Sequence, residues 1–444
     1  MLEKFFGFKE NGTTLKTEII AGLTTFVTMA YIIIVNPLTL ATPETGMDFG
    51  AVMMATCLSA AFTTLLMGLY ANYPFALAPG MGLNAFFSYT LVMHMGVSWE
   101  TALGVVFISG LIAMLVAVSR IRETVIKAIP MHLKTAIGAG IGLFIAFIGL
   151  QNAGIIVDNP ATLLGFGKIT DPHVLLAIFG LIVTGILLVK KVTGSIILGI
   201  LITTVVGLFV PAGDGTMITN FQPGALGIFD LPPSIAPTLF KLDILGALKF
   251  SLFAAIFSLF FVDMFDTIGT LVGVASKTNL MDEKGNLKRG NKALYVDFIG
   301  TMMGAFLGTS NVTTYVESAS GVNAGGRTGM TAVVVGILFL LSTFLSPVVL
   351  AIPGVATAPA LILVGVMMAT GLKNIDWDDM LTAIPCFLTV IMMPLSYSIA
   401  TGLAVGFVTY VLLSFLTGRG KDVHWVMYIL SLLFVLYFIV QATV

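Results

Sequence analysis

Most of the information about this fold lies in two stretches: PFALAPGMGLNAFFSYT (74–90) and GTSNVTTYVESASGVNAGG (308–326). In the first, Pro74 and Pro79 prevent a continuous helix, and the glycines that follow loosen the backbone. The second is too polar to face lipid. Its β-branched, Asn- and Ser-rich opening SNVTT predicts a short extended stretch that leads into a half-helix. Both stretches therefore predict broken segments rather than ordinary helices.

The chain as a whole has the composition of an integral membrane protein. Of its 444 residues, 57% are hydrophobic and only 10% are charged, whereas soluble domains carry about 25% charged residues. The net charge of −1 argues against a basic nucleic-acid-binding protein. Cys57 and Cys386 lie in separate apolar runs and make neither a disulfide framework nor a metal cluster. We expect no metal site and no cofactor.

Apolar runs between charges and Gly/Pro clusters predict fourteen membrane-spanning segments. A bilayer core of about 30 Å needs roughly 20 apolar residues per helix, and fewer where protein surrounds a broken helix. A further apolar run at 424–443 either crosses the membrane or lies along it. The fourteen segments are 18–40, 51–71, 75–92, 100–118, 132–152, 173–189, 193–210, 245–275, 293–308, 312–324, 329–350, 356–371, 380–394 and 397–416.

The Lys and Arg residues predict the orientation of these segments. If the N-terminus, 1–17, is cytoplasmic, all of the 21 basic residues except Lys168, Lys241 and Lys249 fall on the cytoplasmic side. The long segment 211–244 is rich in proline and is expected to be an extracytoplasmic loop rather than a span. We therefore expect a multi-pass protein of the cell inner (plasma) membrane.

The two broken stretches occupy matching places, because each is the third segment in a run of seven. With seven segments per half, the two halves enter the membrane from opposite sides, as inverted repeats do. Interrupted segments at corresponding positions of two such halves indicate the binding site of a transporter. The alternative is a pair of structural breaks that bind no ligand.

Four carboxylates lie inside apolar or broken segments. Asp263 and Asp266 are one turn apart on one face of the eighth segment. Asp297 lies in the ninth segment and Glu317 in the tenth. A charge at the bilayer centre costs at least about 2.5–3.5 kcal/mol, so such residues tend to face a cavity and mark a pathway. For each of them the alternative is a structural hydrogen bond to a neighbouring helix, and this alternative is strongest for Asp263.

These carboxylates indicate the kind of ligand and of coupling ion. Proton uptake by a buried carboxylate and substrate binding beside it are linked, because each changes the free energy of the other. Sodium remains an alternative, because carboxylate, amide and carbonyl oxygens also bind hard cations. Carboxylates accept hydrogen bonds, half-helix N-termini donate them, and aromatic rings such as Phe265 cover flat faces. The combination predicts a small, flat, neutral ligand such as a nucleobase.

The motifs together resemble one group of transporters. They are EIIAGLTTFVTMAYIIIVNP (18–37), ALAPGMGLNAFF (76–87), FVDMFDTIGTLVGV (261–274), DEKGN (282–286), ALYVD (293–297), GTSNVTTYVESASGV (308–322) and GGRTG (325–329). This set resembles the AzgA-like purine permeases, a subgroup of the nucleobase–cation symporters (the nucleobase–ascorbate transporter superfamily), and the resemblance covers essentially the whole chain. Members of the subgroup carry adenine, or guanine and hypoxanthine, together with protons.

The resemblance implies an all-α polytopic fold of fourteen helices in two inverted seven-helix repeats, with short antiparallel strands in the third and tenth segments. It also implies a core domain and a gate domain, each built from both repeats. Relatives often function as dimers, so the resemblance is compatible with a homodimer. The implied boundaries are 18–118 and 245–350 for the core domain and 132–210 and 356–416 for the gate domain, with 424–443 outside this pattern.

The resemblance also assigns roles to residues. Glu317 in TTYVESASG corresponds to the acid that binds the base, and Asp266 in DMFDTIGT to the acid of helix 8 that binds substrate or couples the proton. Asp297 in ALYVD matches an essential acid of helix 9. Asn84 and Thr24–Thr25 fall on motifs that face the core. The expected sets are Glu317, Asp266, Asn84, Phe265, Val316 and Thr25 for substrate binding, and Asp266, Glu317 and Asp297 for proton coupling.

We therefore expect a secondary active importer of purine bases, with adenine favoured over guanine and hypoxanthine, that works by proton symport and alternating access. The alternatives are an anion transporter of the same fold, a sodium-coupled carrier, and a passive transporter. An anion transporter would need a positively charged pocket. Here the acids Asp266 and Glu317 lie near the half-helix ends, which disfavours an anion. An enzyme is disfavoured, because the four histidines form no HExxH pair and no GxSxG elbow or Walker motif occurs.

Overall fold

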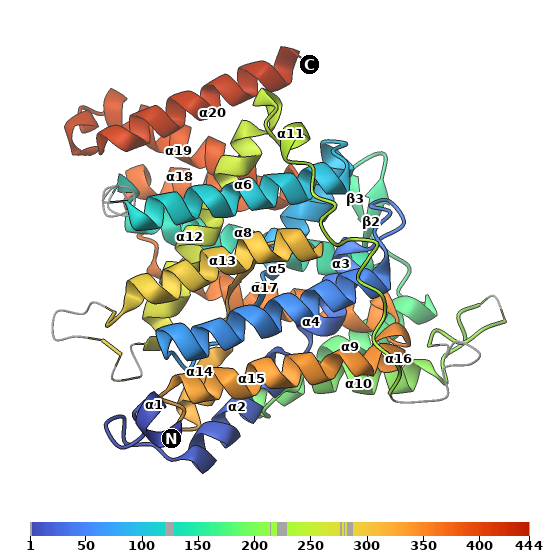
Figure 1. The fold of residues 1–444 in the computed structure, drawn as a ribbon. Helices are drawn as coiled ribbons and strands as arrows, with labels where there is room; N and C mark the ends of the chain where they lie inside the picture. Colours follow the sequence, from blue (N-terminus) through green and yellow to red (C-terminus); the bar gives the residue numbers. More distant parts are fainter. Residues whose placement is uncertain are drawn as a thin grey trace.

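The computed structural model describes residues 2–119, 128–213, 215–219, 229–275, 278, 280–281 and 287–443. Among these residues, nine helices are long and apolar enough to cross a membrane, and three shorter apolar helices accompany them. Figure 1 shows most helices running side by side along a common direction, with the loops gathered at two ends. The chain is thus a polytopic helical membrane protein, and the count of fourteen spans stays a prediction.

The first half of the chain surrounds the first broken segment. Its α-helices are α1 (Leu2–Phe6), α2 (Leu15–Met29), α3 (Ile32–Leu40), α4 (Phe49–Leu66), α5 (Met81–Ala85), α6 (Trp99–Val118), α8 (Met131–Asn152), α9 (Pro172–Val189) and α10 (Ser195–Gly207). Its π-helices and strands are η1 (Met67–Ala71), β1 (Leu77–Pro79), η2 (Phe86–His94), β2 (Ile156–Asn159) and β3 (Leu163–Phe166). The π-helices η1 and η2 directly continue α4 and α5.

The second half places a strand and a short helix at its own broken segment, as the first half does. Its α-helices are α11 (Ile244–Ala247), α12 (Phe253–Ala275), α13 (Gly290–Leu307), α14 (Ser318–Asn323), α15 (Gly329–Ser342), α16 (Ser346–Leu350), α17 (Gly354–Ala369), α18 (Met380–Leu395), α19 (Ile399–Leu416) and α20 (Trp425–Thr443). Its strand is β4 (Val312–Thr314). Its 3-10 helices are η3 (Phe250–Leu252), η4 (Thr343–Leu345), η5 (Thr370–Asn374) and η6 (Gly420–Asp422). Strand β4 precedes α14 as β1 precedes α5.

The two broken segments pair with each other. β1 and β4 form an antiparallel sheet in which Leu77 lies opposite Thr314 and Pro79 opposite Val312. All residues of both strands are buried. The pairing therefore satisfies backbone polar groups that would otherwise stay unpaired in the membrane interior. The predicted antiparallel strands in the third and tenth segments are confirmed.

A second sheet was not expected from the sequence. β2 and β3 form an antiparallel hairpin between α8 and α9, with Ile156 opposite Phe166. The hairpin is mostly exposed, so no alternation of apolar and polar residues marks its strands in the sequence. The hairpin is an addition to the otherwise helical fold. The DEKGN motif (282–286) and residues 214 and 220–228 of the expected outer loop lie outside the described residues.

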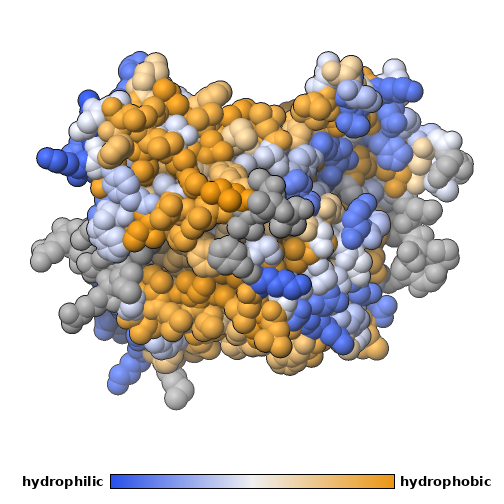
Figure 2. Space-filling model, turned by 90° about the horizontal axis from the view of Figure 1, so that it is seen from above, coloured by the Kyte–Doolittle hydropathy of each residue, from blue (hydrophilic) through white to orange (hydrophobic). Residues whose placement is uncertain are grey.

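The helices pack in two groups. α8, α9, α10, α17, α18 and α19 pack mainly on one another, whereas α2–α6 pack with α12–α15 around the β1–β4 sheet. Helix α20 packs on α19. In Figure 1 its axis runs at an angle to the axis of α6. Figure 2 shows hydrophobic residues over the middle of the surface and hydrophilic residues towards its left and right ends. This distribution is the one that a lipid-embedded protein requires.

Candidate functional site

A cavity of about 420 Å³ lies where the two broken segments meet. Both groups of helices contribute to its walls, because α8 and α17 lie across from α12 and the β1–β4 sheet. The lining residues are Tyr31, Gly80, Met81, Gly82, Leu83, Gly138, Ile141, Val262, Asp266, Thr270, Thr313, Thr314, Tyr315, Val316, Glu317, Val364, Met367 and Met368. The cavity therefore combines a mainly apolar wall with two carboxylates and a few hydroxyl groups.

Backbone pairing between the broken segments fixes one end of the cavity. The N–H of Gly80 donates to the carbonyl oxygen of Asn311 over 2.9 Å, which continues the β1–β4 ladder, and α5 begins at the next residue. The hydroxyl of Tyr315 donates to the carbonyl oxygen of Pro79 over 2.5 Å. These bonds hold the start of α5 and the end of β4 together as one unit.

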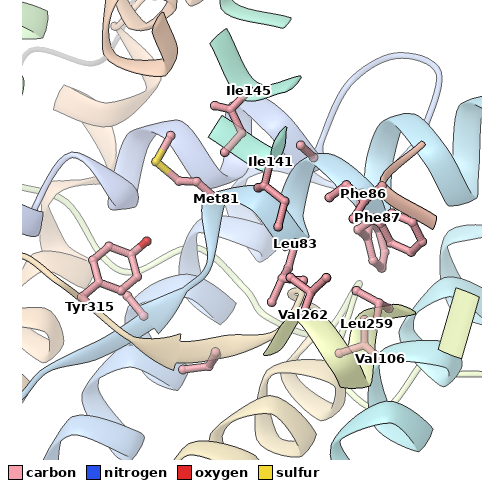
Figure 3. Close-up of a cluster of buried hydrophobic side chains, with 14 of the residues drawn as sticks. Met81, Leu83, Phe86, Phe87, Val106, Ile141, Ile145, Leu259, Val262 and Tyr315 are labelled. Carbon is pink, nitrogen blue, oxygen red and sulfur yellow. The ribbon is translucent and has the colours of Figure 1, made fainter. Parts of the chain in front are cut away.

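A close approach between α5 and α8 forms the apolar wall. A Cβ atom at Gly82 would lie 2.4 Å from Cγ2 of Ile141, so only glycine allows this approach. Figure 3 shows Leu83 of α5 between Ile141 of α8 and Val262 of α12, with Met81 beside them. The wall can cover the flat face of a ligand without offering it a hydrogen bond.

Glu317 stands directly before α14 and points into the cavity. The hydroxyl of Tyr31 donates to its Oε1 atom over 2.6 Å. Tyr31 lies at the break between α2 and α3, so this break positions the donor. Among the described residues, no other side chain donates to the half-buried Glu317 carboxylate. The carboxylate therefore keeps acceptor capacity for a hydrogen bond from a ligand.

Asp266 faces the same cavity from α12. Its side chain is exposed to the cavity, and within the described part of the chain no hydrogen bond holds its carboxylate. The negative charges of Asp266 and Glu317 lie close enough to repel each other. A proton on one of them, or N–H donors placed between them, would relieve this repulsion.

Asp297 is fully buried and has a structural set of partners. Its Oδ2 atom accepts from the Thr267 hydroxyl over 2.6 Å, and its Oδ1 atom accepts from the backbone N–H and the hydroxyl of Thr314, each over 2.8 Å. The Thr267 hydroxyl also lies 2.9 Å from that of Thr313. Asp297 therefore joins α12, α13 and β4 behind the cavity rather than facing it.

The structure places three of the expected binding residues outside the cavity lining. The ring of Phe265 is half-buried and lies beneath the amino group of Lys134, 5.0 Å from the ring centroid. Asn84 is buried and accepts a hydrogen bond from the hydroxyl of Ser310. Thr25 is buried at a close contact between α2 and α14. The cavity lining thus includes none of these three residues.

The sequence analysis did not identify two side chains, Tyr31 and Glu18, that bond to the chain on either side of α14. The only sequence signal for Tyr31 was a hydroxyl-bearing ring in an aliphatic run, MAYIII, where a helix break was not foreseen. Glu18 is fully buried at the start of the predicted first segment. Its carboxylate accepts from the N–H of Arg327 over 2.9 Å and from the hydroxyl of Thr331 over 2.6 Å. Glu18 thus caps the start of α15.

A larger cavity of about 880 Å³ lies near the β2–β3 hairpin and the start of α9. Its lining includes Tyr89, Lys168 and Asp171. The backbone N–H of His173 lowers the pKa of the exposed Asp171 side chain by donating to it over 2.8 Å. The one carboxylate in its described lining, Asp171, thus bonds the start of α9, whereas Asp266 and Glu317 both face the smaller cavity. The smaller cavity is therefore the better candidate for the functional site.

A sequence model described as the Permease family matches residues 16–405. The chain belongs to this family, the nucleobase–ascorbate transporters. The permease is 53% identical to a candidate permease of Methanocaldococcus jannaschii, over 99% of this chain and 98% of the relative. It is 49% identical to a guanine/hypoxanthine permease of Bacillus subtilis, over 99% of each chain. It is 46% identical to an adenine permease of Escherichia coli, over 98% and 95% of the two chains.

The fold of this permease is also found in solved transporters. The transmembrane domain of a cyanobacterium bicarbonate transporter superposes with a TM-score of 0.65 at 16% identity, over 87% of this chain and 97% of that chain. A murine Slc26a9 anion transporter in the inward-facing state superposes with a TM-score of 0.65 at 13% identity, over 90% and 68% of the two chains. At these identities the likeness concerns the fold alone. The expectation of a polytopic helical transporter, not an enzyme, is confirmed.

Proposed function

We propose that this permease imports purine nucleobases together with protons across the cell inner membrane. The observation that carries the proposal is the cavity, in which Glu317 and Asp266 face one small space between the two broken segments. Relatives that cover nearly the whole chain are named as guanine/hypoxanthine and adenine permeases. Purine bases carry N–H donors on their edges, and carboxylates are acceptors for such donors.

Glu317 is the main acceptor for the base. Its Oε2 atom accepts a hydrogen bond from a ring or exocyclic N–H group, while Tyr31 holds Oε1 and thereby fixes the orientation of the carboxylate. The flat faces of the base pack against the apolar wall around Leu83 and Ile141. Val316, whose side chain is 62% exposed, contributes apolar surface at the edge of the cavity.

Asp266 helps to bind the base and takes up the coupled proton. Because proton and base both act on the repulsion between Asp266 and Glu317, the binding of one changes the affinity for the other. Asp297 belongs to the same coupling set through its bonds to Thr314, which connect the cavity wall to α12 and α13. The alternative coupling ion is sodium, for which these oxygen atoms are also suitable ligands.

Transport follows from movement of the two groups of helices against each other. We assign 18–118 and 245–350 to a core domain and 132–210 and 356–416 to a gate domain, with the cavity between them. Sliding of the core domain along the gate domain would open the cavity to one side of the membrane and then to the other. In this proposal the N-terminus is cytoplasmic and the permease works as a homodimer.

Adenine is the favoured base. Its exocyclic amino group adds a donor where guanine and hypoxanthine present a carbonyl oxygen, and two carboxylates face the cavity. The hydroxyl groups of Thr270 and Thr313 can donate or accept, so a carbonyl at that position could also be bound. An anion fits the cavity less well, because its described lining contains two acids and no Lys, Arg or His.

Uptake measurements test the proposal. Cells that lack their own purine permeases and express this chain should take up radiolabelled adenine saturably, and a protonophore should collapse the uptake. Guanine, hypoxanthine and uracil in the same assay identify the preferred base. If uptake depends on a sodium gradient instead, sodium and not the proton is the coupled ion. If no base is taken up although the protein is present in the membrane, the proposal is wrong.

The carboxylate of Glu317 provides a sharper test. Glu317→Gln replaces a carboxylate with two acceptor oxygen atoms by an amide with one acceptor oxygen and one NH2 donor. We expect high-affinity uptake to be abolished while the protein still reaches the membrane. Glu3→Gln in the exposed part of α1 is the matched control and should leave uptake unchanged. Normal uptake by Glu317→Gln would remove Glu317 from the binding site.

A further inference from the structure

The larger cavity, here called the hairpin cavity, lies between the same two groups of helices as the cavity that holds Glu317 and Asp266, here called the substrate cavity. Its volume is about 880 Å³, which is within the range of small-molecule sites. Helix α3 and η2 line the hairpin cavity on one side, and α8, α9, α17 and the β2–β3 hairpin line it on the other. The hairpin cavity can therefore hold a ligand of the size of a purine.

Helix α8 connects the two cavities. Gly138 and Ile141 line the substrate cavity. Further along the same helix, Gln151 and Asn152 line the hairpin cavity. Ile141 and Asn152 are eleven positions apart, which is about three turns, so they share one face and lie about 16 Å apart along the axis. One face of α8 thus passes from one cavity to the other.

Helices α3 and α17 repeat this arrangement. Tyr31, at the start of α3, lines the substrate cavity, and Leu38 of α3 lines the hairpin cavity. On α17, Met368 lines the substrate cavity and Leu361 the hairpin cavity. Each pair is seven positions apart, and residues at this spacing share a helix face. The two cavities are therefore two chambers of one interface between the groups of helices.

Aromatic rings lie between the two chambers. The ring centroid of Tyr397 is 5.9 Å from that of Phe144 and 5.5 Å from that of Phe147. Both phenylalanines belong to the part of α8 between the two sets of lining residues. The ring of Tyr397 also lies 6.5 Å from that of Tyr89, which lines the hairpin cavity. A ligand that enters from the hairpin end therefore reaches Tyr89 before it reaches Glu317.

The side chains of the hairpin cavity suit a flat, neutral ligand. The charged groups of its described lining, Lys168 and Asp171, have opposite signs. The amides of Gln151 and Asn152 can each donate and accept hydrogen bonds. Asn152 lies next to the hydroxyl of the half-buried Tyr89, whose ring is an aromatic surface on which a planar molecule can stack. These are the groups that a nucleobase requires.

We propose that the hairpin cavity is a second binding site for the purine base, occupied before the substrate cavity opens to that side. The amide of Gln151 pairs with a neighbouring donor and acceptor on one edge of the base, as Gln side chains do with adenine. The ring of Tyr89 stacks on a flat face of the base. The inference rests on the proposed function, to which it adds the residues that select the base at the hairpin end.

The β2–β3 hairpin supplies a fixed wall for this site. The N–H of Gly167 donates to the carbonyl oxygen of Ile155 over 2.9 Å. A Cβ atom at Gly167 would collide with the carbonyl oxygen of Gly154, so only glycine allows this approach. The end of the hairpin is thereby held against the end of α8 that carries Gln151. Val157 of β2 also lines the cavity, and its position can report whether a ligand is bound.

Thiol labelling of the purified permease tests the site. Val157→Cys places a thiol in the wall of the hairpin cavity, and the native Cys57 and Cys386 are buried. We expect adenine or hypoxanthine to slow the reaction of this thiol with a maleimide. The slowing should persist when Glu317→Gln is added, because the hairpin cavity binds the base without the substrate cavity. If neither base slows labelling in the Glu317→Gln background, the inference is overturned.

Further substitutions in this background identify the binding groups. Gln151→Ala removes the amide and should raise the half-protecting concentration of base about 10-fold. Tyr89→Leu should raise it by a similar factor, whereas Tyr89→Phe keeps the flat ring and should leave it unchanged. The control is Thr135→Ala at the other end of α8, where the hydroxyl bonds the carbonyl oxygen of Met131. Equal half-protecting concentrations in Gln151→Ala and Thr135→Ala would overturn the inference.

Uptake by cells places the site on the transport path and separates the inference from the proposed function. Gln151→Ala alone should raise the half-saturating concentration for uptake, and an unchanged value would contradict the inference even if the cavity binds base. If the native permease takes up no purine, the proposed function fails, and the labelling of Val157→Cys alone decides whether the hairpin cavity binds base. If it takes up purine but base does not protect Val157→Cys in the Glu317→Gln background, the second site is overturned and the proposed function stands.

Discussion

At the scale of single residues, the hydrogen bond from Tyr31 fixes the orientation of the Glu317 carboxylate. Tyr31→Phe removes this bond without changing the shape of the ring. Hydrogen bonds to charged groups contribute about 1.5–3 kcal/mol, so we expect base binding to weaken about 10- to 100-fold, measured as the rise in the half-saturating concentration for uptake. Tyr428→Phe removes a hydroxyl bonded in a distant loop and is the control. Equal half-saturating concentrations in the wild type, Tyr31→Phe and Tyr428→Phe would contradict the role of Tyr31.

The hydroxyl of Thr267 serves stability rather than recognition. Thr267→Val removes the donor to Oδ2 of Asp297 and leaves a buried carboxylate oxygen without that partner. We expect a loss of about 1–3 kcal/mol in the free energy of unfolding, read as a lower melting temperature of the detergent-purified permease. In the control Thr204→Val, the lost hydroxyl is bonded only to the carbonyl of Ile200 on its own helix. A variant that melts like this control would show that Asp297 does not need Thr267.

Residue positions were only partly predictable from the sequence. The sequence identified the four intramembrane carboxylates because charges are rare in apolar runs, and the structure places Asp266 and Glu317 at one cavity. It favoured a structural role for Asp263, and the resemblance assigned the site role to Asp266, but the helical positions alone do not show which of the two faces a cavity. Residues three apart on a helix differ by about 60° in direction, and the cavity edge passes between these two side chains. The same limit applies to Asn84, which lies on the expected helix but behind the wall.

At the scale of elements, the sequence predicted strong local signals and missed weak ones. Proline, glycine and a β-branched run marked β1 and β4, which pair as expected. The exposed β2–β3 hairpin has no such signal. The predicted segment 245–275 is divided in the structure into α11, η3 and α12. The pairing of β1 with β4 joins residues more than 230 positions apart. Matching positions in the two halves indicated a shared binding site, and the resemblance implied the antiparallel strands.

Close helix packing gives a prediction at this scale. A Cβ atom at Gly142 of α8 would lie 2.5 Å from Cβ of Met368 and 2.9 Å from the carbonyl oxygen of Gly365, so Gly142→Ala must push α17 away. We expect a loss of about 1–3 kcal/mol in stability from overpacking, measured by thermal unfolding. Gly185→Ala in α9 meets open space and should be neutral or slightly stabilising. Equal melting temperatures for both variants would mean that α8 and α17 can separate freely.

At the scale of the whole molecule, the two cavities lie towards opposite ends of the helices. On α12, Gly269, Val272 and Gly273 are exposed beyond Asp266, which indicates an opening towards the end of this helix. Figure 1 places the start of α13 and the N-terminus at the left, and the β2–β3 hairpin at the right. Towards the hairpin, the ring of Tyr397 lies 6.5 Å from that of Tyr89. We therefore predict that the candidate cavity opens on the side of the N-terminus.

This one-sided opening can be measured by thiol labelling, because the native Cys57 and Cys386 are both buried. Val316→Cys places a thiol at the cavity edge. We expect a membrane-impermeant reagent to label it from the side of the N-terminus, more slowly when the transported base is present. The control Phe166→Cys, at an exposed position of β3, should be labelled from the other side.

On the side of the β2–β3 hairpin, where we expect the cavity to be closed, a substitution should have the opposite effect on labelling. The ring of Tyr397 contacts those of Tyr89 and Phe144, and the hydroxyl of Thr90 donates to the backbone carbonyl of Tyr397 over 2.8 Å. Tyr397→Ala removes these ring contacts and a third one with Phe147, but keeps the backbone bond. Combined with Val316→Cys, it should increase labelling from the hairpin side because the cavity opens there more often, and reduce labelling from the side of the N-terminus. If the two sides label Val316→Cys equally before Tyr397 is changed, the described state is not the resting state in the membrane. If Tyr397→Ala leaves a one-sided pattern intact, other contacts close the hairpin side.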